Sequence, residues 1–213
     1  MPQAVTPADI SGYQYEWDGL GPEHLYLLPA VQRELQALQI APKRVFDLGC
    51  GNGSVAHWFS EQGFEVHGVD PSESGVEKAR ESFPRLDLRL GSAYEPLAKT
   101  FGTFPLVVSL EVVEHVYAPR EFAKCVHDLL EPGGHALIST PYHGYLKNLA
   151  LAVTGKLDSH FTALWDHGHI KFWSPKTITQ LLGEAGLVVE RIHRVGRIPV
   201  LAKSMLVVVR KPK

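Results

Sequence analysis

The chain has 213 residues, of which 45% are hydrophobic and 21% are charged, and its formal net charge is −2. These values predict one well-packed globular domain and provide no general attraction to nucleic acid. Two cysteines, Cys50 and Cys125, are too few for a disulfide framework and are typical of a reducing compartment.

The N-terminal residues 1–18 lack the basic-then-apolar pattern of a signal peptide. The longest apolar run, 146–153, is far shorter than the roughly 20 residues that span a bilayer. We therefore expect a cytoplasmic protein without a transmembrane segment. We expect a single domain, in which residues 1–42 form an N-terminal cover segment and a helix and residues 43–213 form the main ligand-binding unit.

The predicted elements begin with a helix over 22–38, where apolar residues recur at spacings of three and four. Short apolar runs then alternate with amphipathic segments. Strands are predicted near 44–48, 64–69, 86–90, 106–110 and 136–140. Helices are predicted near 54–62, 72–82, 119–130 and 175–186. This alternation is typical of an α/β fold, a parallel sheet covered by helices on both faces.

Two features lie outside the regular alternation. Residues 141–173 are rich in histidine and aromatic residues, and we interpret them as a lid or substrate insertion after the fifth strand. The last two strands, near 187–195 and 205–210, are joined by a link too short for a parallel crossover. The sequence therefore predicts a seven-stranded, mostly parallel sheet whose last strand is antiparallel.

A glycine-rich turn follows the first strand, in Asp47-Leu-Gly-Cys-Gly-Asn-Gly53. Glycines let the backbone turn sharply and approach a ligand, and Asp70 at the end of the second strand can accept hydrogen bonds from both hydroxyls of a ribose. A ligand-free turn is the alternative. A dinucleotide is disfavoured because Ser54 stands where its third glycine is wanted, and because Asp47 suits a cationic ligand.

These segments together resemble class I S-adenosylmethionine-dependent methyltransferases. The resemblance runs through 45–53, Gly68-Val-Asp-Pro-Ser72, Gly91-Ser-Ala-Tyr94, Ser109-Leu-Glu-Val-Val-Glu-His-Val116 and the Glu131-Pro-Gly-Gly134 turn. It implies a Rossmann-like fold, an S-adenosyl-L-methionine cofactor and transfer of a methyl group.

The resemblance also implies residues for the cofactor site. Glycine-loop residues would back the methionine part, Asp70 would hold the ribose, and later residues would flank the adenine. The implied cofactor residues are Asp47, Gly49, Cys50, Gly51, Asp70, Pro71, Ser72, Ser92, Ala93, Leu110 and Glu111. Ser92 departs from the family pattern, since relatives often carry Asp there.

Methyl transfer to a hydroxyl needs a base or a metal to help remove the proton, and histidine suits this task near neutral pH. His143, His167 and His169 are the catalytic candidates. A local hydrogen-bonding or surface role is the alternative for each.

A divalent cation is a secondary alternative. If the segment after the fourth strand is helical, its acidic residues and histidine share one face. The segment resembles ubiquinone-biosynthesis O-methyltransferases and small-RNA 3′-terminal ribose methyltransferases, some of which use a divalent cation. The implied metal ligands are Glu111, Glu114, His115 and His169.

Aromatic residues suggest how the site is enclosed. Tyr13, Tyr15 and Trp17 are candidates for an N-terminal cover over the cofactor, with a scaffold role as the alternative.

We expect a small-molecule acceptor, most simply a hydroxyl oxygen as in ubiquinone-type O-methyltransferases. We expect no nucleic-acid partner, and a homodimer stays open. The competing interpretations are an RNA 3′-terminal ribose methyltransferase and a non-catalytic module that keeps only the fold.

Overall fold

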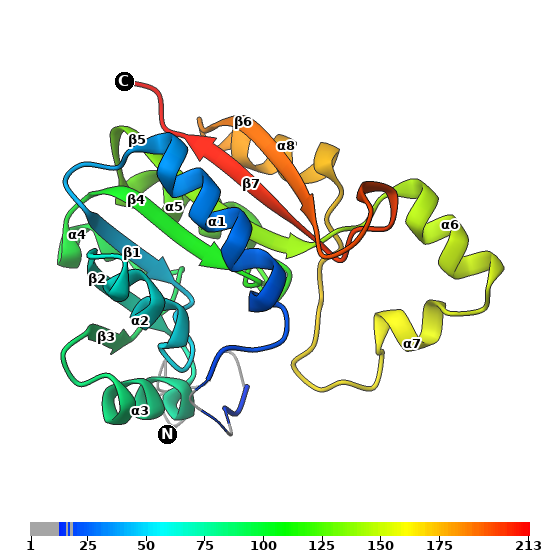
Figure 1. The fold of residues 1–213 in the computed structure, drawn as a ribbon, viewed down its shortest axis with the longest axis horizontal. Helices are drawn as coiled ribbons and strands as arrows, with labels where there is room; N and C mark the ends of the chain where they lie inside the picture. Colours follow the sequence, from blue (N-terminus) through cyan, green and yellow to red (C-terminus); the bar gives the residue numbers. More distant parts are fainter. Residues whose placement is uncertain (1–12, 16, 18) are drawn as a thin grey trace, which may run out of the picture.

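The computed structural model describes residues 13–15, 17 and 19–213, and its centre is a seven-stranded sheet of order β3-β2-β1-β4-β5-β7-β6 (Figure 1). The first five strands run parallel, whereas β7 pairs antiparallel with both β5 and β6. The strands are β1 (Arg44–Leu48), β2 (Glu65–Asp70), β3 (Asp87–Leu90), β4 (Phe104–Leu110), β5 (Leu130–Pro141), β6 (Val188–Val195) and β7 (Ser204–Arg210). The predicted seven-stranded, Rossmann-like arrangement is confirmed.

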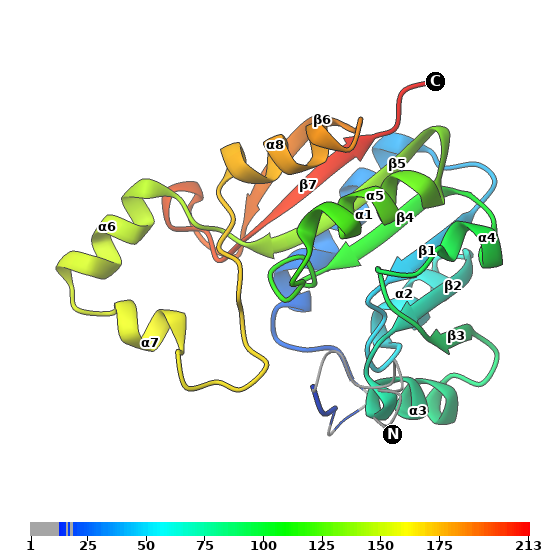
Figure 2. The ribbon, with the colours of Figure 1, turned by 180° about the vertical axis from the view of Figure 1, so that it is seen from behind.

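Helices cover both faces of this sheet (Figures 1 and 2). One face carries α1 and α2, and the other carries α4, α5 and α8. The helices are α1 (His24–Leu38), α2 (Ser54–Glu61), α3 (Glu73–Ser82), α4 (Leu97–Phe101), α5 (Pro119–Leu129), α6 (Tyr145–Val153), α7 (Leu157–Phe161) and α8 (Pro175–Glu184). The sequence analysis missed α4, which is too short to show helical periodicity.

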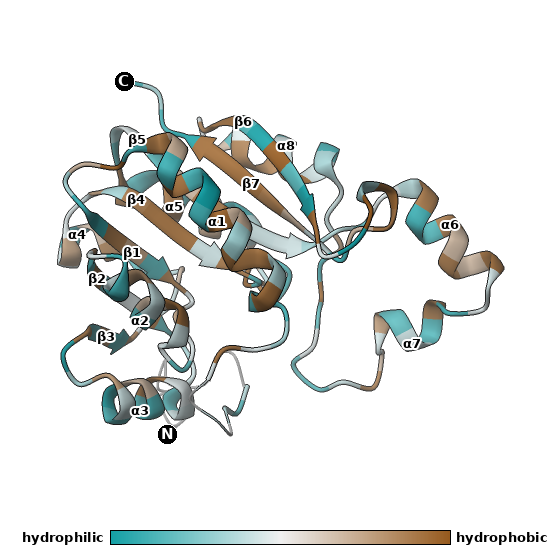
Figure 3. Cartoon of the chain, viewed as in Figure 1, coloured by the Kyte–Doolittle hydropathy of each residue, from teal (hydrophilic) through white to brown (hydrophobic). Residues whose placement is uncertain are grey.

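Side chains of the central strands point alternately to the two faces of the sheet, so the interior has two hydrophobic cores. In β1, Val45 packs in the core beneath α1 and α2, and the next residue, Phe46, packs in the core beneath α5 and α8. Leu106 and Val107 of β4 divide in the same way. Because successive side chains of a strand point to opposite faces, central strands buried on both faces are mostly apolar. The brown strands of Figure 3 show this pattern.

Helix α1 is tied to the far edge of the sheet by a buried acid. The Glu34 carboxylate accepts a hydrogen bond of 2.8 Å from Arg191 and lies 2.7 Å from Nε2 of His193, both on β6. These partners lower the pKa of Glu34, although its burial acts in the opposite direction. The helix before residue 42 therefore packs on the same sheet as the rest of the chain.

Residues 141–173 depart from the layered arrangement. They carry α6 and α7 and extend beyond the end of the sheet (Figures 1 and 2). The chain then returns to the sheet through α8, where Ser174 caps the N-terminus and Pro175 occupies the first turn. No helix in the described part of the chain is long and apolar enough to cross a bilayer. The signal-peptide prediction concerns residues 1–18, of which 1–12, 16 and 18 lie outside the described residues.

Phe46 gives a test of this packing. Its fully buried ring contacts Phe101 and Phe104, with centroid distances of 5.1 and 5.2 Å. We expect Phe46→Ala to lower the free energy of unfolding by about 3–5 kcal/mol, because it removes a buried ring and leaves a cavity. Urea unfolding measures the change. Leu25→Ala, at a 79% exposed position of α1, is the control and should change it by less than about 0.5 kcal/mol.

Candidate active site

The glycine-rich loop lies at the carboxyl end of β1, between β2 and β4. Backbone N–H groups of Gly49 and Cys50 both donate to the Val69 carbonyl, at 2.9 and 3.0 Å, which folds the loop over the end of β2. Gly49 and Gly51 adopt φ angles of 92° and 49°, a region that favours glycine. The site therefore occupies the point where strand order reverses, the usual binding crevice of such sheets.

Asp70 organises this crevice. Its carboxylate accepts the N–H of Gly51 at 2.9 Å and the N–H of Ser72 at 2.8 Å, so one side chain joins the glycine loop to the start of α3. Burial raises the pKa of Asp70 to about 6, while these two hydrogen bonds act to lower it. Each carboxylate oxygen keeps a further lone pair, which suits it to accept the hydroxyls of a ribose.

Asp47, near the end of β1, is buried although its carboxylate is not fully hydrogen-bonded. Its Oδ2 atom has no hydrogen-bond partner among the described residues. Burial, together with the nearby charge of Asp70, raises the pKa of Asp47 to about 8. An unpaired buried carboxylate beside a glycine loop fits a ligand that carries positive charge, because such a ligand would compensate for its lost hydration.

A cavity of about 850 Å³ opens beside this loop and is not filled by side chains. Nearly every predicted cofactor residue lines it. Ser72 does not: its hydroxyl instead accepts the N–H of Gly75 as the cap of α3. The predicted cofactor residues that line the cavity are Asp47, Gly49, Cys50, Gly51, Asp70, Pro71, Ser92, Ala93, Leu110 and Glu111.

Ser92 reaches the cavity through a local turn. Its N–H donates to the Glu95 carboxylate at 2.8 Å, and its hydroxyl accepts the N–H of Tyr94 at 3.3 Å. The hydroxyl therefore holds the turn that shapes the cavity wall.

Glu111, directly after β4, is held by two serines that sequence analysis missed. The hydroxyl of Ser139 donates to Oε1 at 2.8 Å, and that of Ser204 donates to Oε2 at 3.2 Å. Burial raises the pKa of Glu111 to about 7 despite these bonds. The sequence did offer a signal for these serines, since each lies near one end of an apolar strand, Ser139 in β5 and Ser204 in β7. Burying a serine hydroxyl costs free energy unless the hydroxyl has a hydrogen-bond partner.

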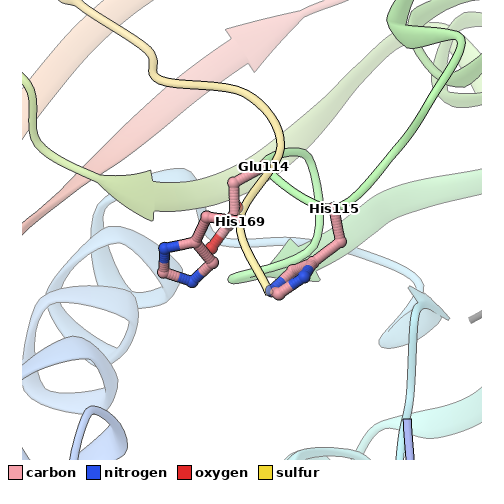
Figure 4. Close-up of side chains that lie close together, drawn as sticks. All are labelled: Glu114, His115 and His169. Atoms are coloured by element: carbon pink, nitrogen blue, oxygen red, sulfur yellow. The ribbon is translucent and has the colours of Figure 1, made fainter. Parts of the chain in front are cut away.

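Three of the four predicted metal ligands come together. They are Glu114, His115 and His169 (Figure 4). Each offers one side-chain ligand atom, and these three atoms lie within 4.8 Å of one another. Both carboxylate oxygens of the fully buried Glu114 lack a hydrogen-bond partner among the described residues. Burial lowers the pKa of both histidines, that of His169 to about 4, so their imidazoles are neutral.

The helical arrangement considered for this segment is wrong. Residues 111–117 form turns, and Glu111 has a φ of 56°. The three residues meet because the chain returns from the insertion: the N–H groups of Ile170 and Lys171 both donate to the Glu114 carbonyl, at 3.0 and 2.9 Å. Glu111 lies outside the group of three.

The remaining predicted histidines also line the cavity. His143 stacks on Phe161 and meets Phe172 edge-on, and burial lowers its pKa to about 4. His167 is exposed, and its carbonyl lies 3.2 Å from Nδ1 of His115. His143 and His169 therefore present neutral imidazoles to the cavity, while the backbone of His167 positions His115.

The known proteins that this chain resembles are methyltransferases. Residues 23–192 match the model of a family described as "Methyltransferase domain". The ubiquinone biosynthesis O-methyltransferase of Ruegeria pomeroyi is 31% identical, over 92% of this chain and 87% of the relative. That of Thiobacillus denitrificans is 34% identical, over 72% of this chain and 68% of the relative. Magnesium protoporphyrin IX methyltransferase from Synechocystis, solved with bound SAH, shares the fold with a TM-score of 0.63 at 19% identity, covering 87% of this chain and 82% of its own.

Asp47 gives a test of the buried charges. Because its folded-state pKa is raised, the folded protein holds a proton that the unfolded chain releases, so stability falls as pH rises from about 4 to about 8. Asp47→Asn should remove that loss and raise the free energy of unfolding at pH 8 by at least about 1 kcal/mol. Urea unfolding at several pH values measures it.

The exposed acid Asp158 is the matched control, because Asp158→Asn makes the same change at a position open to solvent. This variant should keep the pH dependence of the original chain. Parallel curves for Asp47→Asn and the original chain would contradict a raised pKa for Asp47.

Proposed function

This chain belongs to the methyltransferase domain family and is an S-adenosylmethionine-dependent methyltransferase, and we propose that it methylates a hydroxyl oxygen of a small aromatic acceptor. The observation that carries the proposal is the cavity beside the glycine loop, which joins the Asp70 crevice to the histidines and aromatic residues of 141–173. Its similarity to ubiquinone biosynthesis O-methyltransferases supports oxygen as the acceptor atom.

The cofactor half of the proposal rests on residues at the ends of β1 and β2. Asp70 would accept the ribose hydroxyls, Gly49 and Gly51 would let the backbone approach, and Asp47 would face positive charge. The cofactor, when bound, supplies a methyl group on a sulfonium. The protein's task is then to position the acceptor oxygen and to exclude water.

The acceptor half rests on the insertion. Phe172 and Trp165 line the cavity together with His143 and His169, whose imidazoles are neutral near pH 7. A neutral imidazole can take the proton of a hydroxyl as the oxygen is methylated. Aromatic walls favour a flat, apolar acceptor over a charged one. We assign the proton-accepting role to His143 or His169, and a positioning role to His167.

We extend the proposal to a divalent cation held by Glu114, His115 and His169. The unpaired Glu114 carboxylate fits this group, because a cation would satisfy oxygens that are buried without partners. Two neutral imidazoles and a carboxylate are a donor set that Zn²⁺ and Mn²⁺ accept. A cation there would lower the pKa of an acceptor hydroxyl that reached it.

The function is tested by incubating the protein with S-adenosylmethionine and either catechol or aniline, which offer matched aromatic rings with oxygen or nitrogen acceptors. We expect S-adenosylhomocysteine and an O-methyl product with catechol at a rate at least about tenfold above that with aniline. Mass spectrometry and NMR identify the methylated atom.

The control is Asp70→Ala, which removes the proposed ribose contact. It should weaken S-adenosylhomocysteine binding at least about tenfold in calorimetry, because two hydrogen bonds to a charged group are lost. N-methylation of aniline at a higher rate would contradict the oxygen assignment, and unchanged affinity in Asp70→Ala would remove the ribose assignment.

The cation site is tested with Mn²⁺ as the probe, followed by electron paramagnetic resonance without substrate. We expect saturable binding by the original chain, and His169→Ala and Glu114→Gln should weaken it at least about tenfold, since each removes a ligand. His57→Ala on α2, away from the cavity, is the control and should bind Mn²⁺ as the original chain does. Equal affinity in all of these variants would contradict the site.

A further inference from the structure

A segment before α1 lies across the glycine loop. Its described residues, 13–15, 17 and 19–21, are called the strap here. Asn52 of the glycine loop donates from Nδ2 to the carbonyls of Trp17 at 2.9 Å and Gly19 at 3.1 Å. The strap is therefore fastened to the same loop that is proposed to hold the cofactor.

The strap is also fastened to the start of α3. The Ser72 hydroxyl donates to the carbonyl of Tyr13 at 2.7 Å, and the N–H of Tyr15 donates to the hydroxyl of Ser74 at 3.1 Å. Ser72 and Ser74 lie two and four residues after Asp70 in the sequence. Hydrogen bonds from both sides of the crevice thus hold the strap over the Asp70 carboxylate.

Tyr15 is the strap residue that packs against Gly51 of the glycine loop and Gly75 of α3. A Cβ atom on Gly51 would collide with the Tyr15 hydroxyl, and one on Gly75 would lie 2.9 Å from its ring carbon Cδ2. The phenol therefore packs directly on the backbone of the glycine loop and of α3. Gly51 is the residue whose N–H binds Asp70, so Tyr15 stands beside the proposed ribose contact.

The strap also forms one wall of the cavity. Tyr13, Tyr15 and Trp17 line it, as does Leu110 at the end of β4. Tyr13 and Tyr15 meet edge-to-face with ring centroids 4.8 Å apart, which fixes the orientation of the Tyr15 ring. A ligand seated between the glycine loop and Leu110 would have the strap on its remaining open side.

We propose that Tyr15 is a cofactor-contacting residue and that the strap closes over bound S-adenosylmethionine and limits its release. This inference rests on the proposed cofactor site. The side chains that hold the strap by hydrogen bonds, Asn52, Ser72 and Ser74, are positioning residues. Because the strap must move aside for the cofactor to leave, loosening it raises the dissociation rate more than it changes the association rate.

The test measures S-adenosylhomocysteine release by stopped-flow tryptophan fluorescence, since Trp17 and Trp165 both line the cavity, and affinity by calorimetry. Tyr15→Ala should release the ligand at least about tenfold faster. Tyr15→Phe, which keeps the ring, should stay within about threefold of the original chain. Ser74→Ala removes one fastening without touching the crevice and should give an intermediate rate. Tyr145→Ala, at an 87% exposed position on α6, is the matched control and should release at the original rate.

The outcomes separate the strap from the cofactor site. Binding by the original chain with equal release rates in Tyr15→Ala and Tyr145→Ala would overturn the strap proposal and leave the cofactor site standing. Failure of the original chain to bind S-adenosylhomocysteine would overturn both. Urea unfolding checks that each variant is folded; if Tyr15→Ala is not, unchanged release from Ser74→Ala overturns the proposal, and faster release supports it.

Discussion

The hydrogen bonds of the Asp70 carboxylate are the constraint on which the rest of the site depends. One oxygen binds the N–H of Gly51 and the other binds the N–H of Ser72, so the ends of two neighbouring strands share one buried anion. These bonds place the glycine loop, the cap of α3 and, through Ser72 and Ser74, the strap. A carboxylate that already orders its surroundings presents its remaining lone pairs to a ligand without reorganisation, which is the condition for electrostatic preorganisation.

Buried acids around the cavity set the energetics of this arrangement. Burial raises the pKa values of Asp47, Asp70, Glu111 and Glu114, and both Asp47 and Glu114 retain oxygens without partners among the described residues. Buried acids without partners destabilise the folded protein when no ligand is bound. Groups with such shifted pKa values are common at functional sites. A cationic cofactor beside Asp47 and a metal ion beside Glu114 would each compensate for part of this cost.

Two covers from opposite parts of the chain enclose the cavity. Strap residues line the side that we propose for the cofactor, and residues of the insertion between β5 and α8 line the side that we propose for the acceptor. The insertion is attached through backbone groups, since Ile170 and Lys171 bind the Glu114 carbonyl and the Trp173 indole donates to the Val113 carbonyl at 3.1 Å. Leu146 and Leu149 of α6 are exposed, so this face of the helix is not packed into the core. Figure 3 shows apolar stretches along α6. The acceptor side is thus built from a segment with fewer core contacts than the sheet, as substrate loops commonly are.

Local pattern in the sequence determined the sheet, the helices at its faces and the positions of the glycine loop and Asp70. Apolar residues recur about every 2 residues in strands and about every 3.6 residues in helices, and the conformational freedom of glycine is a property of the single residue. Both can be recognised in a short segment without knowledge of the fold. Only the tertiary structure decided which distant residues meet. Ser139 and Ser204 reach Glu111, His169 reaches Glu114, and Tyr15 reaches Gly51, from four separate parts of the chain. Residues 111–117 carried a spacing compatible with a helix, but the returning insertion binds their backbone and holds them as turns, because a long-range hydrogen bond outweighs the weak preference of a short segment.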